Sequence, residues 1–351
     1  MNRLSALGCL LLSVLVGITV ALVPASEQKI AAGQQPQIAR DAKGTLRVIY
    51  GNGDTIFCAT SSDNGLRFSP PQPVGVVPQL HLGMFRGPQV ASSKNYTLVS
   101  AMDKGGTIHV FRLHHPTGQW TKASRINDVE ASTPEGLMAL AADDADHFYA
   151  TWLDVRDDQK NKIYFSQSTD QGLSWAPNRL VYKGPEGTVC ECCRPSIAAQ
   201  GSQVAIMFRN KVNGSRDLYL TQSETAGKTF SEPLKLGKGT WQLNACPMDG
   251  GGLVISPASG ITTVWQRAGK VYVAKPGAVE QEISAGRRCS IASPENPVIT
   301  WQQGEDLKLM ILKENRTVDV GKGGFLKVAR TQDGKILGVW EADKVIRYKR
   351  M

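Results

Sequence analysis

The sequence lacks three features that would assign it to common classes of protein. Beyond residue 25 no segment stays apolar for 18 residues, so we expect no later membrane-spanning helix. The net charge of +9 is not concentrated in any block rich in Lys and Arg, so we expect no nucleic-acid partner. No apolar stripe at the 3.6-residue helical spacing extends beyond a turn or two, which leaves little of the chain to form helices.

The composition is that of a folded, turn-rich protein. Of the 351 residues, 41% are hydrophobic and 20% charged, which fits a globular fold and excludes wholesale disorder. The 35 Gly and 18 Pro residues favour many turns. The excess positive charge is spread thinly, as on a solvated surface.

The first 25 residues have the pattern of an export signal. A short basic start is followed by an almost wholly apolar run over residues 4–23, and Val23 and Ala25 are small residues where a signal peptidase reads the chain. We predict cleavage after Ala25 and a secreted or periplasmic location. The run is long enough to cross a bilayer, so an uncleaved anchor is the alternative, and membrane contact is expected only in that case.

A repeated unit of short strands fills the rest of the chain. Each unit has an apolar strand, a turn with Gly, Asp or Asn, a second apolar strand that often ends in an aromatic residue, and a third strand. Such self-similarity indicates a repeat architecture. The first two strands of the successive units cover residues 36–50, 87–102, 137–152, 194–208, 252–265, 290–301 and 325–340.

These seven units predict an all-β fold, a β-propeller that forms one domain over residues 26–351. Four-stranded blades around an axis bury their faces against one another and so satisfy such a repeat. The last unit shows only three strands, so we expect residues 26–34 to complete it with residues 324–351 and close the ring. A six-bladed ring is the alternative.

Three units carry a common turn after the third strand. In S-x-D-x-G-x-x-aromatic, the Asp caps backbone N–H groups, the Gly adopts positive φ, and the aromatic residue covers the blade edge. The pattern resembles the Asp-box, or bacterial neuraminidase repeat, of sialidase-like propellers, where it is structural. Its residues are Ser61, Asp63, Gly65 and Phe68, then Ser168, Asp170, Gly172 and Trp175, and finally Ser223, Gly227 and Phe230, the third box lacking the Asp.

The resemblance implies a site for an acidic sugar. Sialidases hold the substrate carboxylate with three arginines, and they use a Tyr nucleophile activated by a Glu together with an Asp acid/base. Two segments are similar to the family's arginine segments, and other arginines are candidates for the same role. The substrate-binding candidates are Arg86, Arg209, Arg194, Arg267 and Arg288, and the catalytic candidates are Asp154, Glu135 and Glu186. No Tyr–Glu pair is assigned.

The residues just before each inner strand should converge at one end of the channel. There the sequence concentrates sulfur, in Cys190, Cys192 and Cys193 of one unit and Cys246 and Met248 of the next. Three interpretations stay open. The first is disulfides, for example from Cys246 to one of the other three, with Cys192 and Cys193 not bonded to each other. The second is a soft-metal site for copper, or for zinc with His81. The third is a redox-active thiol beside Arg194.

The leading hypothesis is an exported, monomeric, sialidase-like propeller that recognises an anionic glycan such as a sialic acid, without a cofactor. The sequence leaves open whether it also hydrolyses the glycan as an exo-α-sialidase-type glycoside hydrolase. The alternative is a non-enzymatic binding or scaffold propeller whose cysteine-rich rim is disulfide-bonded or holds copper or zinc. The first rests on family resemblance and the second on the sulfur cluster.

Overall fold

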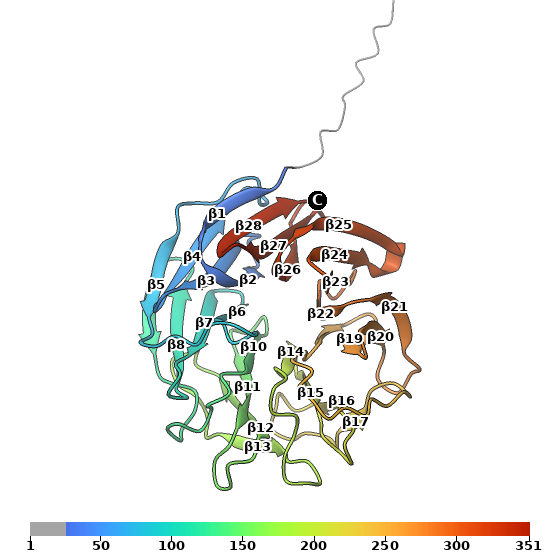
Figure 1. Ribbon diagram of the computed structural model, residues 1–351. Helices are drawn as coiled ribbons and strands as arrows, with labels where there is room; N and C mark the ends of the chain where they lie inside the picture. Colours follow the sequence, from blue (N-terminus) through green and yellow to red (C-terminus); the bar gives the residue numbers. More distant parts are fainter. Residues whose placement is uncertain (1–25) are drawn as a thin grey trace, which may run out of the picture.

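The computed structural model describes residues 26–351, which form a ring of seven four-stranded antiparallel sheets (Figure 1). The predicted export signal, over residues 1–25, lies outside the described residues. Blades 1 to 3 comprise β2 (Gln34–Arg40), β3 (Leu46–Asn52), β4 (Thr55–Ser61) and β5 (Gln72–Val76); β6 (Gln89–Ser92), β7 (Tyr96–Met102), β8 (Ile108–His114) and β9 (Gln119–Ala123); and β10 (Met138–Ala142), β11 (Phe148–Asp154), β12 (Lys162–Ser168) and β13 (Arg179–Tyr182).

The remaining four blades repeat this order from the channel outward. They comprise β14 (Ser196–Gln200), β15 (Gln203–Arg209), β16 (Leu218–Ser223) and β17 (Leu234–Lys235); β18 (Gly252–Ser256), β19 (Gly260–Arg267), β20 (Lys270–Ala274) and β21 (Gln281–Ala285); β22 (Arg287–Ala292), β23 (Val298–Gln303), β24 (Asp306–Ile311) and β25 (Arg316–Lys322); and β26 (Gly324–Arg330), β27 (Ile336–Ala342), β28 (Val345–Arg350) and β1 (Gln28–Ala32). One 3₁₀ turn, η1 (Leu312–Glu314), interrupts the strands of residues 26–351.

The prediction of an all-β, seven-bladed propeller is therefore confirmed, and the six-bladed alternative is wrong for this chain. Within the described part of the chain, no helix has the length and apolar character needed to cross a bilayer.

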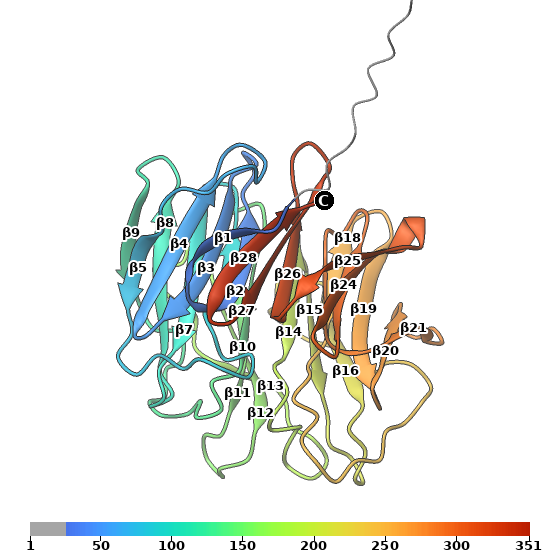
Figure 2. The same ribbon diagram turned by 45° about the horizontal axis from the view of Figure 1, so that its top comes forward.

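Blade 7 joins the two ends of the described chain. The first strand, β1, pairs antiparallel with β28, so that Gln28 lies opposite Tyr348 and Ala32 opposite Val345 (Figure 2). The backbone N–H of Gly33 then donates to the carbonyl of Lys344 at 2.8 Å. An edge strand that would otherwise present unpaired backbone groups is thus covered by the N-terminal segment.

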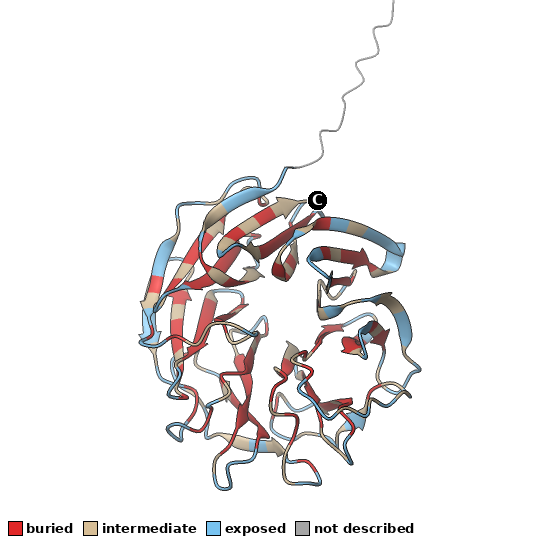
Figure 3. Ribbon diagram, viewed as in Figure 1, coloured by how far each residue is buried: buried red, intermediate tan, exposed pale blue. Residues whose placement is uncertain are grey.

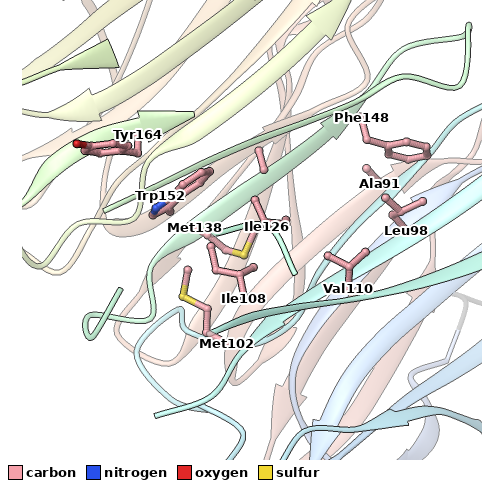
Figure 4. Close-up of a cluster of buried hydrophobic side chains, with 11 residues drawn as sticks. Ala91, Leu98, Met102, Ile108, Val110, Ile126, Met138, Phe148, Trp152 and Tyr164 are labelled. Carbon is pink, nitrogen blue, oxygen red and sulfur yellow. The ribbon is translucent and has the colours of Figure 1, made fainter. Parts of the chain in front are cut away.

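The hydrophobic core lies between blades rather than inside any one of them. The second strand β11 is buried along its whole length and the other second strands along most of theirs, whereas the outer strands are largely exposed (Figure 3). Between blades 2 and 3, Met102 and Ile108 pack with Met138 and Trp152 (Figure 4). Trp152 is fully buried, and truncation of such a side chain costs about 3–5 kcal/mol of stability. Packing between neighbouring blades therefore fixes the ring that positions the site.

Each of the three Asp-box turns packs against the blade before its own. In the second box the Ser168 hydroxyl donates to the Asp170 carboxylate at 2.7 Å and accepts the Gly172 N–H at 2.9 Å. Gly172 has φ of +83°, and the Leu98 side chain of blade 2 lies against it. Because strands alternate in direction, these turns lie at the end of the ring opposite to the starts of the inner strands. The boxes therefore stabilise the fold and lie at the end of the ring opposite to the site described next.

Candidate functional site at the channel mouth

The inner strands of all seven blades described here begin at the same end of the ring, which we call the channel mouth. Inside it lies a cavity of about 210 Å³. Each inner strand contributes two successive residues to the cavity lining, which we call the upper and the lower layer, and Gly251 and Ala292 add to them. The upper layer is Gln37, Gln89, Ala139, Ser196, Gly252, Ser290 and Lys327, and the lower, apolar layer is Ile38, Val90, Leu140, Ile197, Leu253, Ile291 and Val328, with Arg194 above both.

Two cations face this cavity without a direct ion pair, and the buried carboxylate of Asp249 behind the lining partly offsets both charges. Among the described residues, neither Arg194 nor Lys327 forms a salt bridge, and the cavity lining contains no Asp, Glu or Tyr. Arg194 donates through Nη1 to the Gln89 side-chain oxygen at 2.7 Å. Burial, together with the charge of Arg194, lowers the pKa of Lys327 to about 7, and burial lowers the pKa of Arg194 to about 10. An anion placed between the two side chains would offset this cost of burying like charges.

Strained backbone recurs at the mouth. The register shifts at the start of the inner strand in blades 1, 6 and 7, and one non-glycine residue in each shift has positive φ. These residues are Gln35 (54°), Arg288 (56°) and Phe325 (58°). Such bulges redirect a side chain, and they cluster next to functional sites. The backbone conformation of these three residues is therefore energetically unfavourable, and the bulges set the direction of their side chains.

Aromatic and cationic side chains from distant blades meet over the mouth. The rings of Phe85, before β6, and Phe325, in β26, pack edge to face with centroids 5.2 Å apart. The Arg288 guanidinium lies 5.5 Å from the Phe325 ring centroid and 6.0 Å from that of Phe85. The β5–β6 loop therefore reaches toward blades 6 and 7. Beside it lies a groove of about 510 Å³ whose lining includes Arg288, Lys322, Phe325 and Glu341.

The other predicted arginines are engaged elsewhere. Arg86 lies at the rim, where its Nε donates to the Glu135 carbonyl at 2.6 Å and its Nη2 lies 3.4 Å from the Glu135 carboxylate. Arg267 forms an ion pair with Glu280 at 2.6 Å and lies outside the cavity lining.

Arg209 is the most deeply buried of the predicted arginines. It is 1% exposed, and it donates to the carbonyls of Asp249, Arg216 and Gln266 at 2.6–3.1 Å. These bonds tie blade 4 to blade 5. Four of its five N–H donors are used by backbone carbonyls, so Arg209 is held as a structural residue in this arrangement.

The three candidate acids do not line the cavity. Asp154 is fully buried, and its carboxylate accepts hydrogen bonds from Ser132, Trp152 and Arg156 at 2.8–2.9 Å. Glu135 contacts Arg86, and Glu186 is exposed and accepts the Asn213 N–H at 2.8 Å. These carboxylates hold local structure and are not assembled into a pair.

The cysteine-rich loop between β13 and β14 forms a buried cluster of sulfur atoms. Cys190 Sγ lies 3.8 Å from Cys192 Sγ and 3.6 Å from Cys193 Sγ, and Met248 packs against the three residues. Cys246 is exposed and stays outside this cluster. All six cysteines in the described region are free in this structure, which therefore shows no disulfide, such as one from Cys246 to the cluster. His81 does not join the sulfur cluster either.

One thiol of the cluster is set apart by its hydrogen bonds. Contacts from Cys192 and Cys193, together with the Arg216 guanidinium at 3.2 Å, lower the pKa of Cys190. Burial raises the pKa of Cys193 to about 12, and the contact with Cys190 raises that of Cys192. The sequence suggested Arg194 as the cation beside a cysteine, but Arg216 holds that position and Arg194 turns to Gln89.

The seven-bladed ring and its Asp-box turns define a sialidase-like propeller. The profile of the BNR repeat-like domain matches residues 18–284, and the chain belongs to that family. A search of curated proteins gave no significant match.

Solved structures with a similar fold include carbohydrate-binding and carbohydrate-cleaving proteins. A BP39L lectin from Burkholderia pseudomallei is 12% identical with a TM-score of 0.62, over 90% of this chain and 97% of that one. An ulvan lyase bound to -[GlcA(1-4)Rha3S]- is 11% identical with a TM-score of 0.56, over 91% and 94%. A mutant Trypanosoma rangeli sialidase with trans-sialidase activity is 12% identical with a TM-score of 0.51, over 91% and 54%. At these identities the likeness establishes the fold alone.

Four residues of the mouth escaped the sequence analysis. Lys327, Gln35 and Phe325 belong to no recognisable motif, and Phe85 stands out only as the neighbour of Arg86 in the segment similar to a sialidase arginine segment. Alignment of the seven inner strands would have exposed Lys327, because small or uncharged residues fill the same layer in the other six blades. The positive φ of Gln35 and Phe325 follows from bulges, which a sequence pattern does not specify, and Phe85 adopts positive φ in the β5–β6 loop.

Proposed function

We propose that this protein binds an anionic glycan at the channel mouth, with the acidic group held by Arg194 and Lys327. The observation that carries the proposal is the cavity of about 210 Å³, in which these two cations are the charged lining residues. Its size suits one terminal acidic sugar or its acid group. The rest of a larger glycan would then extend over the rim.

The chemistry of the two cations suits a carboxylate or a sulfate. A guanidinium has five N–H donors, and Gln89 accepts from one nitrogen of Arg194. The remaining donors match the paired oxygens of an acid group. The ammonium of Lys327 adds a second positive charge in a site partly removed from water, where ion pairing is stronger than in bulk solvent.

The rim offers a surface for the sugar ring. Phe325 and Arg288 line the neighbouring groove of about 510 Å³. An aromatic face packs against the apolar C–H face of a sugar, and a guanidinium donates hydrogen bonds to its hydroxyl and acid oxygens. The fold analogy with a lectin and with a lyase bound to a uronate-containing glycan supports the same class of ligand.

We propose binding rather than hydrolysis as the main activity. A sialidase-type reaction needs a Tyr nucleophile and carboxylates around the sugar. No such side chain lines the cavity formed by the described residues, and the candidate acids have other partners. The export signal predicted for residues 1–25 would place this binding outside the cytoplasm.

The experiment is a direct binding measurement with a matched pair of sugars. Purified protein is titrated by calorimetry with 3′-sialyllactose and with lactose, and also with a glucuronate oligosaccharide. We expect the acidic sugars to bind more tightly than lactose. Equal binding of lactose, or no binding of either acidic sugar, would contradict the proposal. A chromogenic sialoside added in a parallel assay reports hydrolysis, and turnover there would overturn the assignment as a binding protein.

A further inference from the structure

The three thiols of the β13–β14 loop have the arrangement of a ligand set. Their sulfur atoms all lie within 4.8 Å of one another, and the residues are between 0% and 7% exposed. The separations of 3.6 and 3.8 Å are much longer than a disulfide bond, which is about 2.05 Å. Three sulfurs at about 2.3 Å from a shared metal ion would stand about 3.7–4.0 Å apart. The observed separations fall near that range.

A fourth sulfur comes from the next blade. Met248 precedes β18 and packs against Cys190, Cys192 and Cys193. Its backbone has φ of 53°, an uncommon and costly conformation for a residue with a side chain. Gly250, two residues later, lies so close to Arg194 that a Cβ there would fall 1.8 Å from the Arg194 carbonyl oxygen. The strained segment therefore holds the thioether against the thiols of the neighbouring blade.

The charges around the cluster suit bound thiolates. The Arg216 side chain is 7% exposed, and its Nη1 donates to Cys190 Sγ at 3.2 Å and to Glu191 at 3.1 Å. Packing alone does not explain why a buried guanidinium donates to a thiol. A cation at this position offsets the negative charge of a thiolate–metal group, and hydrogen bonds to the ligating sulfur tune such sites.

We propose that Cys190, Cys192 and Cys193, with Met248 as a fourth donor, bind one copper(I) ion. Thiolate and thioether are soft ligands, which favour Cu(I). Structural zinc sites use four Cys or His ligands, and the described residues gather only three such groups here. This site is distinct from the cavity proposed for the glycan, and the inference does not depend on that function.

The test is a copper titration of the full chain. The protein is reduced, freed of metal and titrated anaerobically with Cu(I) in competition with bicinchoninate. We expect one tightly bound equivalent per chain and a sulfur-only shell in X-ray absorption. Cys190→Ser should lose this equivalent. Met248→Leu leaves every thiol in place and should weaken binding, about tenfold or more if the thioether is a ligand.

Cys246→Ser is the matched control, because it removes an exposed thiol from the Met248 loop without touching the cluster. It should bind copper like the wild type, and circular dichroism should show that all variants fold. The proposal is overturned if the wild type binds no copper in competition, or if Cys246→Ser loses the ion while Cys190→Ser keeps it. It is also overturned if zinc displaces copper from the site, or if thiol counting and mass mapping of the isolated protein place two cluster cysteines in a disulfide.

Discussion

Arg194 of blade 4 donates a hydrogen bond of 2.7 Å to Gln89 of blade 2 and thereby reaches past blade 3 within the channel. Both residues line the cavity, together with Lys327 from blade 7. Side chains separated by more than a hundred positions in the chain thus form one site, and only closure of the ring brings them together. This relationship leads directly to the first two predictions.

Removal of either channel cation should weaken binding of an acidic sugar. A charge-assisted hydrogen bond is worth about 1.5–3 kcal/mol, so Arg194→Gln and Lys327→Met should each lower the affinity for 3′-sialyllactose by about 10- to 100-fold. Calorimetric titration measures the change. Arg67→Gln is the control, since that exposed arginine belongs to an Asp-box at the other end of the ring. A loss of affinity in Arg67→Gln equal to that in Arg194→Gln would show that overall charge, not the cavity, attracts the sugar.

Binding of an acidic sugar should also weaken as the pH rises through about 7. Burial and Arg194 lower the pKa of Lys327 to about 7, while Asp249 and Cys289 oppose this. Below that pH Lys327 is charged and pairs with the anion; above it the side chain is neutral and the attraction is lost. A bound anion will raise this pKa, so the midpoint in titrations should lie somewhat above that of the free protein. Lys327→Met should flatten the pH profile between 6 and 8, and an unchanged slope would contradict the assignment.

The sequence was sufficient for the ring because its signals are local and repeated. The alternation of apolar residues, the turn residues and the Asp-box at Ser168 are patterns of residues close in the chain. Because the unit recurs seven times, these patterns predict a propeller. The site was harder, because its partners are set by the tertiary fold. Arg209 looked like a ligand-binding arginine in its segment, yet it donates to the Arg216 carbonyl of its own blade and to two carbonyls of blade 5.

The cysteines show the same limit. The sequence placed Cys190, Cys192 and Cys193 near Met248, and the structure brings these four residues together. It could not show that Cys246, two residues from Met248, points out to solvent. Nor could it identify Arg216 as the partner of Cys190, since the two are 26 positions apart and the contact depends on how the loop folds back.

The glycine of an Asp-box should resist substitution more than a glycine in an open turn. Gly172 and Gly53 both have positive φ, and the αL conformation costs a residue with a Cβ about 1–2 kcal/mol. A Cβ on Gly172 would lie 2.3 Å from the Leu98 side chain, whereas one on Gly53 meets nothing within 4 Å. Gly172→Ala should therefore lower the free energy of unfolding by about 1–3 kcal/mol more than Gly53→Ala does. Urea denaturation of the two variants tests this, and equal losses would contradict the role of the box in joining blades.

An Asp at the third position of the third Asp-box should stabilise the protein. Thr225 occupies the Asp position, and its hydroxyl accepts the Thr229 N–H at 3.0 Å. In the second box the Asp170 carboxylate accepts both from Ser168 and from the Ser174 N–H. Thr225→Asp should therefore gain about 0.5–1.5 kcal/mol, because a hydrogen bond to a charged acceptor replaces a neutral one. The melting temperature measures the gain, and Thr225→Asn separates the effect of shape from that of charge.

The pairing of β1 with β28 has a consequence for how this protein is made. Gln28 emerges from the ribosome among the earliest residues of the domain, yet its partner Tyr348 follows 320 positions later. Strand β1 is thus synthesised first but pairs last, and the other six blades can pack together before β1 closes the ring. Until β1 and β28 pair, each of them exposes unpaired backbone N–H and C=O groups. Assembly should accordingly be slowest, and most exposed to self-association, at that final step.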